Sequence, residues 1–362
     1  MSAAPPALVP PPLDFSVART ASAPHRAAGA VCRGAVVLQG AATGTSADES
    51  IFSAASLSKC VIAIVALQCC ERGEVGLDDD VCAGSAPVPV RNPAFPDAPV
   101  TLRHLLCHRS GLRDDESALH CGSQWRRDAE RSANADSRSL DFVAASLDEY
   151  VDARLSKAQG LWSPAEAPGQ SRYHYSNLGM TIAAAYLQRR AGCGFAQLAK
   201  ERVFAPLAMH SSSFTLADLP RAPLNAVVYG MAEWPAAGLR TTLSDLLRLL
   251  AELTSSPQDC RLLSPASVAL MLPADGRDGL AWWGVDASYG EKTFPHGMCW
   301  THGGFMEEVR THIYWWPAAR VAAAVLQTGE DEYESVRAAL FAALDELGHL
   351  PVASTVTSVV LS

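Results

Sequence analysis

The stretch Ala54-Ala55-Ser56-Leu57-Ser58-Lys59-Cys60-Val61-Ile62-Ala63-Ile64-Val65-Ala66-Leu67 decides the fold of this chain. It stays apolar to Cys70 and stops at Glu71-Arg72-Gly73, which predicts a helix over residues 54–70. A helix that is apolar on all sides is a buried one. The chain has four lysines, and only Lys59 follows a serine by three positions. The pattern Ser-x-x-Lys therefore occurs once, at the start of a helix that we expect in the core.

A buried lysine beside a serine is an arrangement that can activate a nucleophile. Residues three apart share a helix face, so Lys59 should lie beside Ser56 Oγ. Burial lowers the pKa of a lysine, and the helix start directs N–H groups and a positive dipole end at a reacting carbonyl. In the alternative, Ser56 only caps the helix and Lys59 extends to its rim. This motif alone leaves both interpretations open.

A second motif, Tyr175-Ser176-Asn177, precedes a helical pattern over residues 178–190. A nearby Lys59 ammonium would stabilise the phenolate and lower the pKa of Tyr175 towards neutrality. Asn177 has a donor and an acceptor, so it could hold Lys59 with one end and a substrate carbonyl with the other. The alternative is a tyrosine that packs on a helix start and an asparagine that caps it.

A third motif, His302-Gly303-Gly304, precedes a β-rich stretch over residues 309–316. Paired glycines weaken a strand unless another chain must approach its backbone closely. A substrate lying along this edge would explain them, with the N–H of Phe305 as an oxyanion donor. His302 could then bond to the substrate or to the tyrosine. The alternative is an ordinary turn.

In this order the three motifs resemble the serine β-lactamase and penicillin-binding-protein superfamily, in the branch with class C β-lactamases, D-aminopeptidases and carboxylesterases. Residues 102–112 resemble that branch's Leu-Leu-Thr-His-Thr-Ser-Gly-Leu segment, with Cys107 and Arg109 where threonines are usual. The likeness spans residues 29–348. It implies an α/β (α+β) fold of the β-lactamase type, with an antiparallel sheet flanked by helices and a mostly helical lobe.

The resemblance also implies a role for each motif residue. Ser56 would be the nucleophile, Lys59 its activating amine, Tyr175 the general base that also returns a proton to the leaving group, and Asn177 a positioning amide. The N–H groups of Ser56 and Phe305 would form the oxyanion hole, and His302, Gly303 and Gly304 would bind substrate. Glu166 does not match the deacylating glutamate of class A enzymes, because it precedes Tyr175.

His302 stands where the family usually has the lysine of Lys-Thr-Gly. A lysine is a permanent cation, whereas an unperturbed imidazole is mostly neutral at pH 7. We therefore expect carboxylesterase-like hydrolysis of a small ester or amide through an acyl-enzyme on Ser56. β-Lactamase, D-peptidase and transacylase activities stay open within the family. A catalytically inactive binding or scaffold protein is the alternative from another class.

Composition fits a soluble enzyme, and the resemblance implies a small-molecule ester, amide or lactam as its substrate. The chain has 362 residues with 49% hydrophobic content, enough for a full core, and a net charge of −9 argues against a nucleic-acid partner. We expect one catalytic domain over 29–348, with an α/β lobe (29–100 and 275–348) and a helical lobe (101–274). The flanking tails are a Pro-rich segment 1–28, expected to be disordered, and residues 349–362. Further helices are expected over 140–154, 244–253 and 333–347, and strands near 29–38 and 314–326.

Three features bear on environment and cofactors. No stretch reaches the roughly 20 apolar residues of a membrane span and no secretory signal is evident, so we expect a cytoplasmic protein. A basic N-terminal segment leaves an organellar transit segment open. The ten cysteines predict free thiols, and no Cys/His spacing indicates zinc or another cofactor. The oligomeric state stays open.

Two segments keep alternatives open. The charged, aperiodic residues 113–135 predict a mobile insertion, with a substrate lid as the alternative. Five tryptophans predict core packing, with an aromatic wall beside the third motif as the alternative. They are Trp282, Trp283, Trp300, Trp315 and Trp316.

Overall fold

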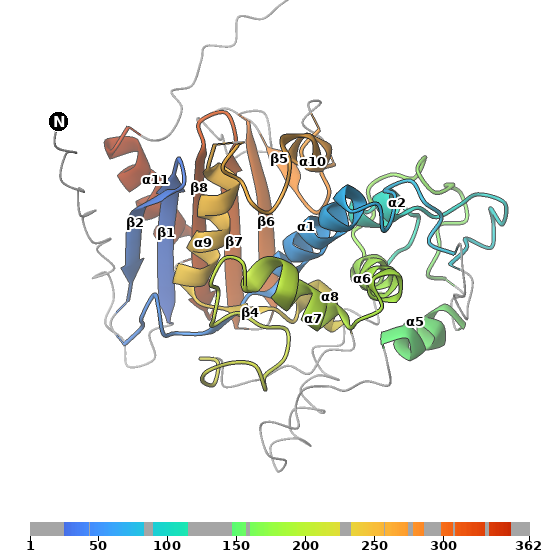
Figure 1. Ribbon diagram of the computed structural model, residues 1–362, viewed down its shortest axis with the longest axis horizontal. Helices are drawn as coiled ribbons and strands as arrows, with labels where there is room; N and C mark the ends of the chain where they lie inside the picture. Colours follow the sequence, from blue (N-terminus) through green and yellow to red (C-terminus); the bar gives the residue numbers. More distant parts are fainter. Residues whose placement is uncertain are drawn as a thin grey trace, which may run out of the picture.

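Apolar runs from both ends of the chain form one antiparallel sheet (Figure 1). A computed structural model describes residues 25–42, 44–82, 90–114, 147–156, 160–224, 233–256, 258–273, 278–285, 298–306, 308–329 and 333–348. The strands are β1 (Arg26–Cys32), β2 (Ala35–Ala41), β5 (Trp283–Val285), β6 (Cys299–Met306), β7 (Val309–Trp316) and β8 (Val321–Thr328). Their order is β2-β1-β8-β7-β6-β5, which joins the N-terminal hairpin to the C-terminal strand. The expected β-lactamase-like fold class is confirmed.

The first strand corrects one expected boundary. β1 begins at Arg26, inside the segment 1–28 that we expected to be disordered. Residues 26–28 pair with residues 325–327 of β8, at the other end of the chain. A partner so distant in sequence leaves no local signal, which is why the boundary was placed too late. Residues 1–24 and 349–362 lie outside the described part of the chain.

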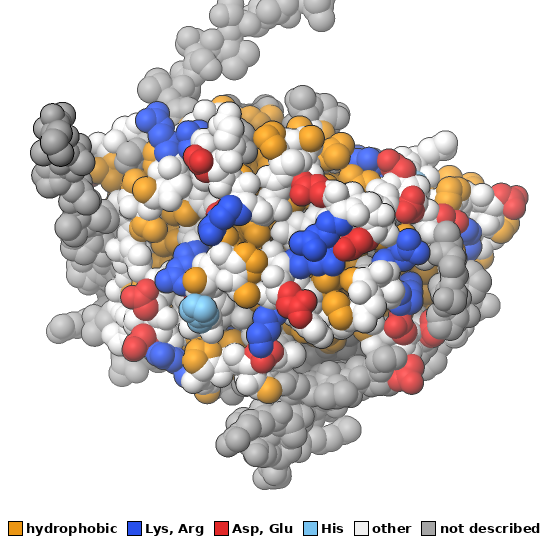
Figure 2. All heavy atoms as spheres, in the orientation of Figure 1, with side chains coloured by type: hydrophobic (Ala, Val, Ile, Leu, Met, Phe, Trp, Pro, Cys, Tyr) orange, Lys and Arg blue, Asp and Glu red, His pale blue; other side chains and the backbone are white. Residues whose placement is uncertain are grey.

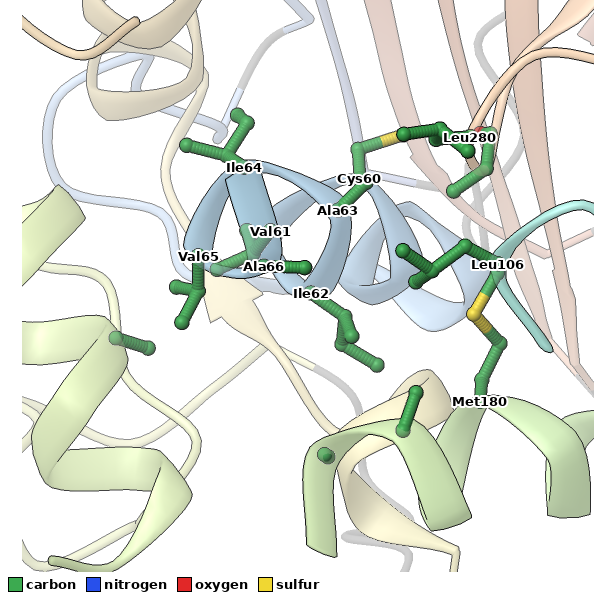
Figure 3. Close-up of a cluster of buried hydrophobic side chains, with 14 of the residues drawn as sticks. Cys60, Val61, Ile62, Ala63, Ile64, Val65, Ala66, Leu106, Met180 and Leu280 are labelled. Atoms are coloured by element: carbon green, nitrogen blue, oxygen red, sulfur yellow. The ribbon is translucent and has the colours of Figure 1, made fainter. Parts of the chain in front are cut away.

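The motif helix lies at the centre of the molecule. A 3-10 turn, η1 (Ala55–Leu57), leads into α1 (Ser58–Glu71), so the predicted helix over 54–70 begins with a tighter turn. Every residue of α1 from Ser58 to Cys69 is buried. Figure 3 shows its side chains packed against Leu106, Met180 and Leu280. Burial of each isoleucine or leucine contributes about 1.5–3 kcal/mol, which fixes this helix in the core.

The other helices surround α1 and the sheet (Figure 1). α6 starts after Ser176, whose hydroxyl accepts the N–H of Gly179 (2.9 Å), and ends at Ala191, where Gly192 follows with a φ of 72°. α6 and α8 both contact α1. The bounds are α2 (Leu102–Leu106), α5 (Leu147–Ser156), α6 (Asn177–Ala191), α7 (Phe195–Ala199), the π-helix η3 (Lys200–Phe204), α8 (Trp234–Ala237), α9 (Leu243–Thr254), α10 (Pro265–Met271) and α11 (Tyr333–Glu346).

The expected division into lobes is wrong at α9. This helix lies in the range 101–274 that we assigned to the helical lobe, yet it packs on β1 and β8 of the sheet (Figure 1). The approach is close, since a Cβ at Gly29 would lie 2.8 Å from Leu247 Cδ1. α11 covers the opposite face through Val336, Leu340 and Leu344. The apolar face of α9 is buried against the sheet. The sequence of the helix predicts this face but does not indicate which lobe it will pack against.

Two short strands connect the motif helix to the rest of the chain. β3 (Phe52–Ser53) pairs with β4 (Arg240–Thr241), directly before η1 and directly before α9. The N–H of Ala54 also donates to the Leu239 carbonyl (2.8 Å). The turn that carries Ser56 is therefore held by a segment nearly two hundred residues away.

The surface charges, the cysteines and the possible metal ligands of the described residues bear on what the fold could bind. On the face seen in Figure 2, basic and acidic side chains are interspersed. Nine cysteines fall in the described ranges, and all nine are free thiols. In those ranges no helix is long and apolar enough to cross a membrane, and no cluster of three or more His, Cys, Asp or Glu side chains could hold a metal.

Candidate active site

The turn that presents Ser56 is fixed from several sides. Ala55, the residue before it, has a φ of 48°, in the left-handed region. Ser58 Oγ donates to the Ala55 carbonyl (2.6 Å) and accepts the N–H of Leu239 (2.9 Å). Thr311 Oγ1 of β7 donates to the Ala54 carbonyl (2.8 Å). These contacts hold the strained residue in place and set the direction of the serine side chain.

Lys59 is fully buried and its amine makes three hydrogen bonds. Nζ donates to Ser56 Oγ (3.0 Å), to Asn177 Oδ1 (2.7 Å) and to the Ala236 carbonyl (2.8 Å). Burial lowers the pKa of Lys59 to about 7, although the carboxylates of Asp114 and Glu233 act in the opposite direction. The amine therefore lies beside the serine in a state that can both hold and release a proton near neutral pH.

Tyr175 contacts the same serine from the other side. Its Oη donates to Ser56 Oγ (2.7 Å), and Lys59 Nζ lies 4.8 Å from the centre of its ring. Burial of the hydroxyl raises the pKa of Tyr175. The bond to Ser56 opposes this shift, while Asp114 and Glu233 add to it.

The predicted lowering of the Tyr175 pKa was therefore wrong. The prediction counted the Lys59 ammonium as the nearest charge. It did not include two carboxylates that disfavour a phenolate, nor the burial that makes Lys59 itself easier to deprotonate. In this site, Lys59 rather than Tyr175 has a pKa suited to accept a proton at neutral pH.

Asn177 is the first residue of α6, and both ends of its amide are occupied. Oδ1 accepts from Lys59, and Nδ2 donates to Asp114 Oδ2 (2.8 Å). The helix cap is the neighbouring Ser176, so the alternative in which Asn177 is the cap does not apply. The Nδ2 group carries two hydrogens and Asp114 accepts one of them, so the bond from Asn177 to a substrate carbonyl stays a prediction.

His302 lies on β6, fully buried, and its protonation can be deduced from its contacts. Nδ1 is 2.6 Å from the Ala281 carbonyl, which only accepts, so Nδ1 carries the hydrogen. Nε2 is then an acceptor, and it has no partner among the described residues. Burial, with the charge of Lys59, lowers the pKa of His302 to about 3. The side chain is a neutral imidazole at pH 7.

The two glycines of the third motif face opposite sides of β6. A Cβ at Gly304 would lie 2.6 Å from the Ala54 carbonyl and 3.1 Å from Ala55 Cβ, so only glycine permits this approach to the serine turn. A Cβ at Gly303 would meet His312 on the other face, at 3.1 Å. β5 pairs with residues 299–301 and stops short of this part of β6.

Phe305 follows Gly304, and its side chain is directed away from the serine. It is 67% exposed and stacks with Arg310, its partner on β7, at 3.4 Å from guanidinium carbon to ring centre. The oxyanion contact predicted for Phe305 involves its backbone N–H and not this exposed ring. The position of this N–H is set by the close approach of Gly304 to Ala54 and Ala55.

Three residues beside the motifs were missed by the sequence reasoning: Asp114, Glu233 and His108. Asp114 was included in the predicted insertion 113–135, of which residues 115–135 lie outside the described part of the chain, as does the question of a lid. One acidic residue in a charged stretch does not indicate a site residue, so no sequence signal pointed to Asp114.

Glu233 is the second carboxylate beside the motifs. Tyr150 Oη donates to Glu233 Oε1 (2.8 Å), and shielding from water together with Asp114 raises the pKa of Glu233 to about 7.

His108 and Trp283 form an aromatic border to Tyr175. His108 Nδ1 accepts the N–H of Ser176 (3.1 Å), and its ring lies 4.6 Å from the Tyr175 ring. The Trp283 ring lies 4.3 Å from His302 and 6.0 Å from Tyr175. The other four tryptophans of the group are buried, as core packing predicted, whereas Trp283 is half-buried beside the motif residues. His108 lies in the segment 102–112, which was the available signal for it.

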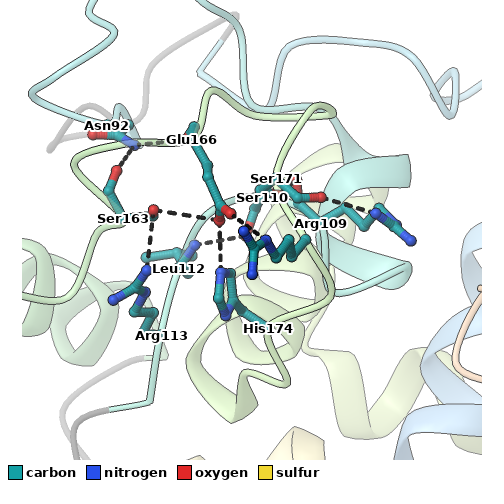
Figure 4. A network of polar contacts seen from close by, with 10 residues as sticks. Asn92, Arg109, Ser110, Leu112, Arg113, Ser163, Glu166, Ser171 and His174 are labelled. Atoms are coloured by element: carbon teal, nitrogen blue, oxygen red, sulfur yellow. Dashed lines mark hydrogen bonds and ion pairs between the residues drawn. The ribbon is translucent and has the colours of Figure 1, made fainter.

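A separate polar network holds the chain on either side of these residues (Figure 4). Arg113 N–H donates to the Leu161 carbonyl (2.8 Å), and its guanidinium donates to Ser163 Oγ (3.2 Å). Glu166 Oε2 lies 2.7 Å from His174 Nε2 within this network. This contact explains the position of the Glu166 side chain, so Glu166 needs no role at Ser56. The two bonds of Arg113 fix this residue, which lies directly before Asp114.

Comparison with known proteins identifies the relatives of this arrangement. The family model described as Beta-lactamase matches residues 19–347. Penicillin-binding protein 4* of Bacillus subtilis (strain 168) is 30% identical over 164 residues, which are 45% of this chain and 30% of that protein. The match therefore spans less than a third of that relative's length.

Two solved structures share the fold at low sequence identity. The octameric penicillin-binding protein homologue from Pyrococcus abyssi superposes with a TM-score of 0.68 at 19% identity, over 90% of this chain and 74% of that one. A D-stereospecific amidohydrolase from Streptomyces sp. gives 0.59 at 18% identity, over 85% and 90% of the two chains.

Proposed function

The chain belongs to the β-lactamase family, and we propose that it is a serine hydrolase that cleaves a small ester or amide through an acyl-enzyme on Ser56. One observation carries the proposal. Ser56 Oγ is within hydrogen-bond distance of both Lys59 Nζ (3.0 Å) and Tyr175 Oη (2.7 Å). A serine held between an amine and a phenol has the groups needed to lose a proton and to return it.

Acylation follows from the protonation states of the two partners. Neutral Lys59 accepts the Ser56 proton as Oγ bonds to the substrate carbonyl carbon. The N–H groups of Ser56 and Phe305 are the candidate donors to the resulting oxyanion. The bond to the leaving alcohol or amine then breaks, and Tyr175 gives its proton to that group while it regains one from Lys59. Water then attacks the acyl-enzyme, with the proton transfers reversed, and releases the acid.

The neutral His302 supports a preference within this chemistry. A substrate carboxylate next to the scissile bond would find no permanent cation at this position, because the pKa of His302 is about 3. The site therefore favours uncharged esters and amides over penicillins. The Streptomyces relative is an amidohydrolase, which keeps amide substrates within the proposal.

The test is the intact mass of the protein after separate exposure to a p-nitrophenyl acyl ester, a penicillin and a fluorophosphonate. We expect a fluorophosphonate adduct on the wild type and none on Ser56→Ala. The matched control is Ser156→Ala, because Ser156 is an exposed serine on α5 that bonds only to the Asp152 carbonyl in the described contacts. This variant should form the adduct as the wild type does.

Two outcomes would contradict the proposal in different ways. An adduct that persists on Ser56→Ala would move the nucleophile elsewhere, and no adduct from any reagent would favour a non-catalytic binding protein. A penicillin that reacts far faster than the ester would still agree with an acyl-enzyme on Ser56. It would overturn the proposed preference for esters.

A further inference from the structure

We propose that Asp114 is a positioning residue of this site, which orients the Asn177 amide so that its oxygen faces Lys59. The inference rests on the proposed hydrolase function. Asp114 lies at the end of the described segment 90–114, outside the three motifs. Its carboxylate is nevertheless the group that binds most extensively to the start of α6.

Four contacts join Asp114 to the first turn of α6. The Asn177 N–H donates to Oδ1 and Oδ2, each at 2.9 Å, and Asn177 Nδ2 donates to Oδ2 at 2.8 Å. The Leu178 N–H donates to Oδ1 at 3.4 Å. A carboxylate at the start of a helix also interacts favourably with the helix dipole. Asp114 therefore binds the backbone and the side chain of the same asparagine.

The chemistry of the two groups fixes the orientation of the amide. An asparagine amide has an accepting end and a donating end, and nothing in its shape distinguishes them. An ionised carboxylate only accepts, so Asp114 selects the NH₂ end of Asn177. The carbonyl oxygen then points to Lys59 Nζ, at 2.7 Å. Without Asp114 the amide could rotate and direct its NH₂ group at the amine, where two donors would meet.

Asp114 also contributes charge at the lysine. The titratable groups around Lys59 are Asp114, Glu233, Tyr175, Cys60, His108 and His302. Of these, Asp114 is the largest contribution that raises the pKa of Lys59 against burial. Removal of its charge should lower the pKa of Lys59, so more of the amine is neutral at a given pH. A role confined to stability would not change this pKa.

The position of Asp114 is itself built into the fold. The preceding residues are held by two backbone hydrogen bonds, from the Ser163 N–H to the Gly111 carbonyl (2.8 Å) and from the Arg113 N–H to the Leu161 carbonyl (2.8 Å). Gly111 has a φ of 81°, which lets the chain turn towards the site. The Asp114 carboxylate is therefore positioned by residues 111–113, which have their own backbone hydrogen bonds.

The test combines a reactivity measurement with a direct titration. Asp114→Asn should react with a fluorophosphonate about 10–100-fold more slowly than the wild type, the range expected when a charge-assisted hydrogen bond at the site is lost. The midpoint of its rate-against-pH profile should move to lower pH. With 15N-lysine labelling, the four lysines give four Nζ signals, and Lys59 is assigned with Lys59→Met. The Lys59 signal should titrate at a lower pH in Asp114→Asn.

Controls separate this inference from the proposed function and from folding. Asp218→Asn removes an exposed carboxylate that pairs with Lys200, and it should leave the rate and the profile unchanged. In an Asn177→Ala background, Asp114→Asn should cost less than about threefold, because the residue through which it acts is absent. Asp114→Glu keeps the carboxylate and should keep the rate and the midpoint of the wild type.

Each result decides one of the two proposals. If the wild type forms no fluorophosphonate adduct, the proposed function fails and the positioning role fails with it. If the wild type reacts and Asp114→Asn keeps both its rate and its Lys59 titration, only the positioning role is overturned. If Asp114→Asn does not fold, the Asp114→Glu profile decides: a wild-type rate and midpoint support positioning by the carboxylate, and a slower rate with an unchanged midpoint contradicts it.

Discussion

The amine of Lys59 is subject to opposing effects. Burial removes water from it, and two carboxylates, Asp114 and Glu233, restore part of the stabilisation that water would give the charged form. A fully exposed lysine would be protonated at neutral pH and could not act as a base, whereas a buried one without carboxylates nearby would lose its charge entirely. The site places the pKa of Lys59 at about 7, between these limits.

The first prediction is that reaction at Ser56 has an acid limb near neutral pH. Lys59 must be neutral to accept the serine proton, so the rate of fluorophosphonate labelling should fall as pH drops through about 7. Rates measured between pH 5 and 9 check this. Lys200→Arg, at an exposed ion pair, is the control and should give the wild-type profile. A rate that is constant across this range would contradict the role of Lys59.

The second prediction concerns Glu233, which titrates in the same range as Lys59. Its pKa is raised to about 7 by shielding from water and by Asp114, so the two groups form a coupled pair. Glu233→Gln removes a carboxylate that raises the pKa of Lys59, and the acid limb should therefore shift to lower pH.

Tyr150→Phe is the companion variant for Glu233. The Tyr150 hydroxyl lowers the pKa of Glu233, so its removal leaves more of that carboxyl neutral and should shift the limb in the same direction by a smaller amount. An acid limb that moves to higher pH in Glu233→Gln would contradict this account of the pair.

At the scale of elements, the contact between β6 and η1 brings the third motif to the first. β6 approaches so closely that the Cβ missing from Gly304 would also clash with Thr311 Oγ1. Thr311 in turn donates to the Ala54 carbonyl (2.8 Å). The strand, its neighbour β7 and the serine turn are therefore positioned as one unit.

The third prediction compares the two glycines of this strand. Gly304→Ala must displace backbone at Ala54, so it should reduce the rate of Ser56 labelling by at least about 10-fold, since a shift of the oxyanion donors costs roughly 1.4 kcal/mol or more. Gly303→Ala meets only the edge of the His312 ring on the opposite face, and its rate should stay close to that of the wild type. Equal losses in the two variants would show that general strand damage, not the contact with η1, is responsible.

At the scale of the whole molecule, the site costs stability. The folded pKa of Lys59 is about 7 and its ordinary value is 10.5, so between these pH values the unfolded chain binds more protons. Below pH 7 the amine is charged in both states and the cost of burying it is fully present. As pH rises from 7 to 10.5 this cost is lost. It amounts to a few kcal/mol.

The fourth prediction follows from that sign. Lys59→Met keeps the length of the side chain and removes the buried amine, so it should raise the free energy of unfolding more at pH 6 than at pH 10. Urea unfolding of both proteins at the two pH values measures the difference. A stabilisation that is equal at both pH values, or larger at pH 10, would contradict the lowered pKa of Lys59.

The sequence by itself determined the family, the fold class and the identity of the residues around Ser56. These follow from signals that are local: an apolar helix with one Ser-x-x-Lys pattern, a tyrosine and asparagine before a second helix, and paired glycines in a strand. A local pattern predicts its own element well because helix periodicity and glycine placement depend on neighbouring residues.

Only the tertiary structure decided which groups surround Lys59 and what their charges do. Asp114 and Glu233 come from segments with no motif, and their effect depends on distance and burial rather than on sequence spacing. For the same reason the direction of the Tyr175 pKa shift was predicted wrongly, and α9 was assigned to the wrong lobe. Long-range contacts set both, because electrostatic energy and packing partners are properties of the folded arrangement.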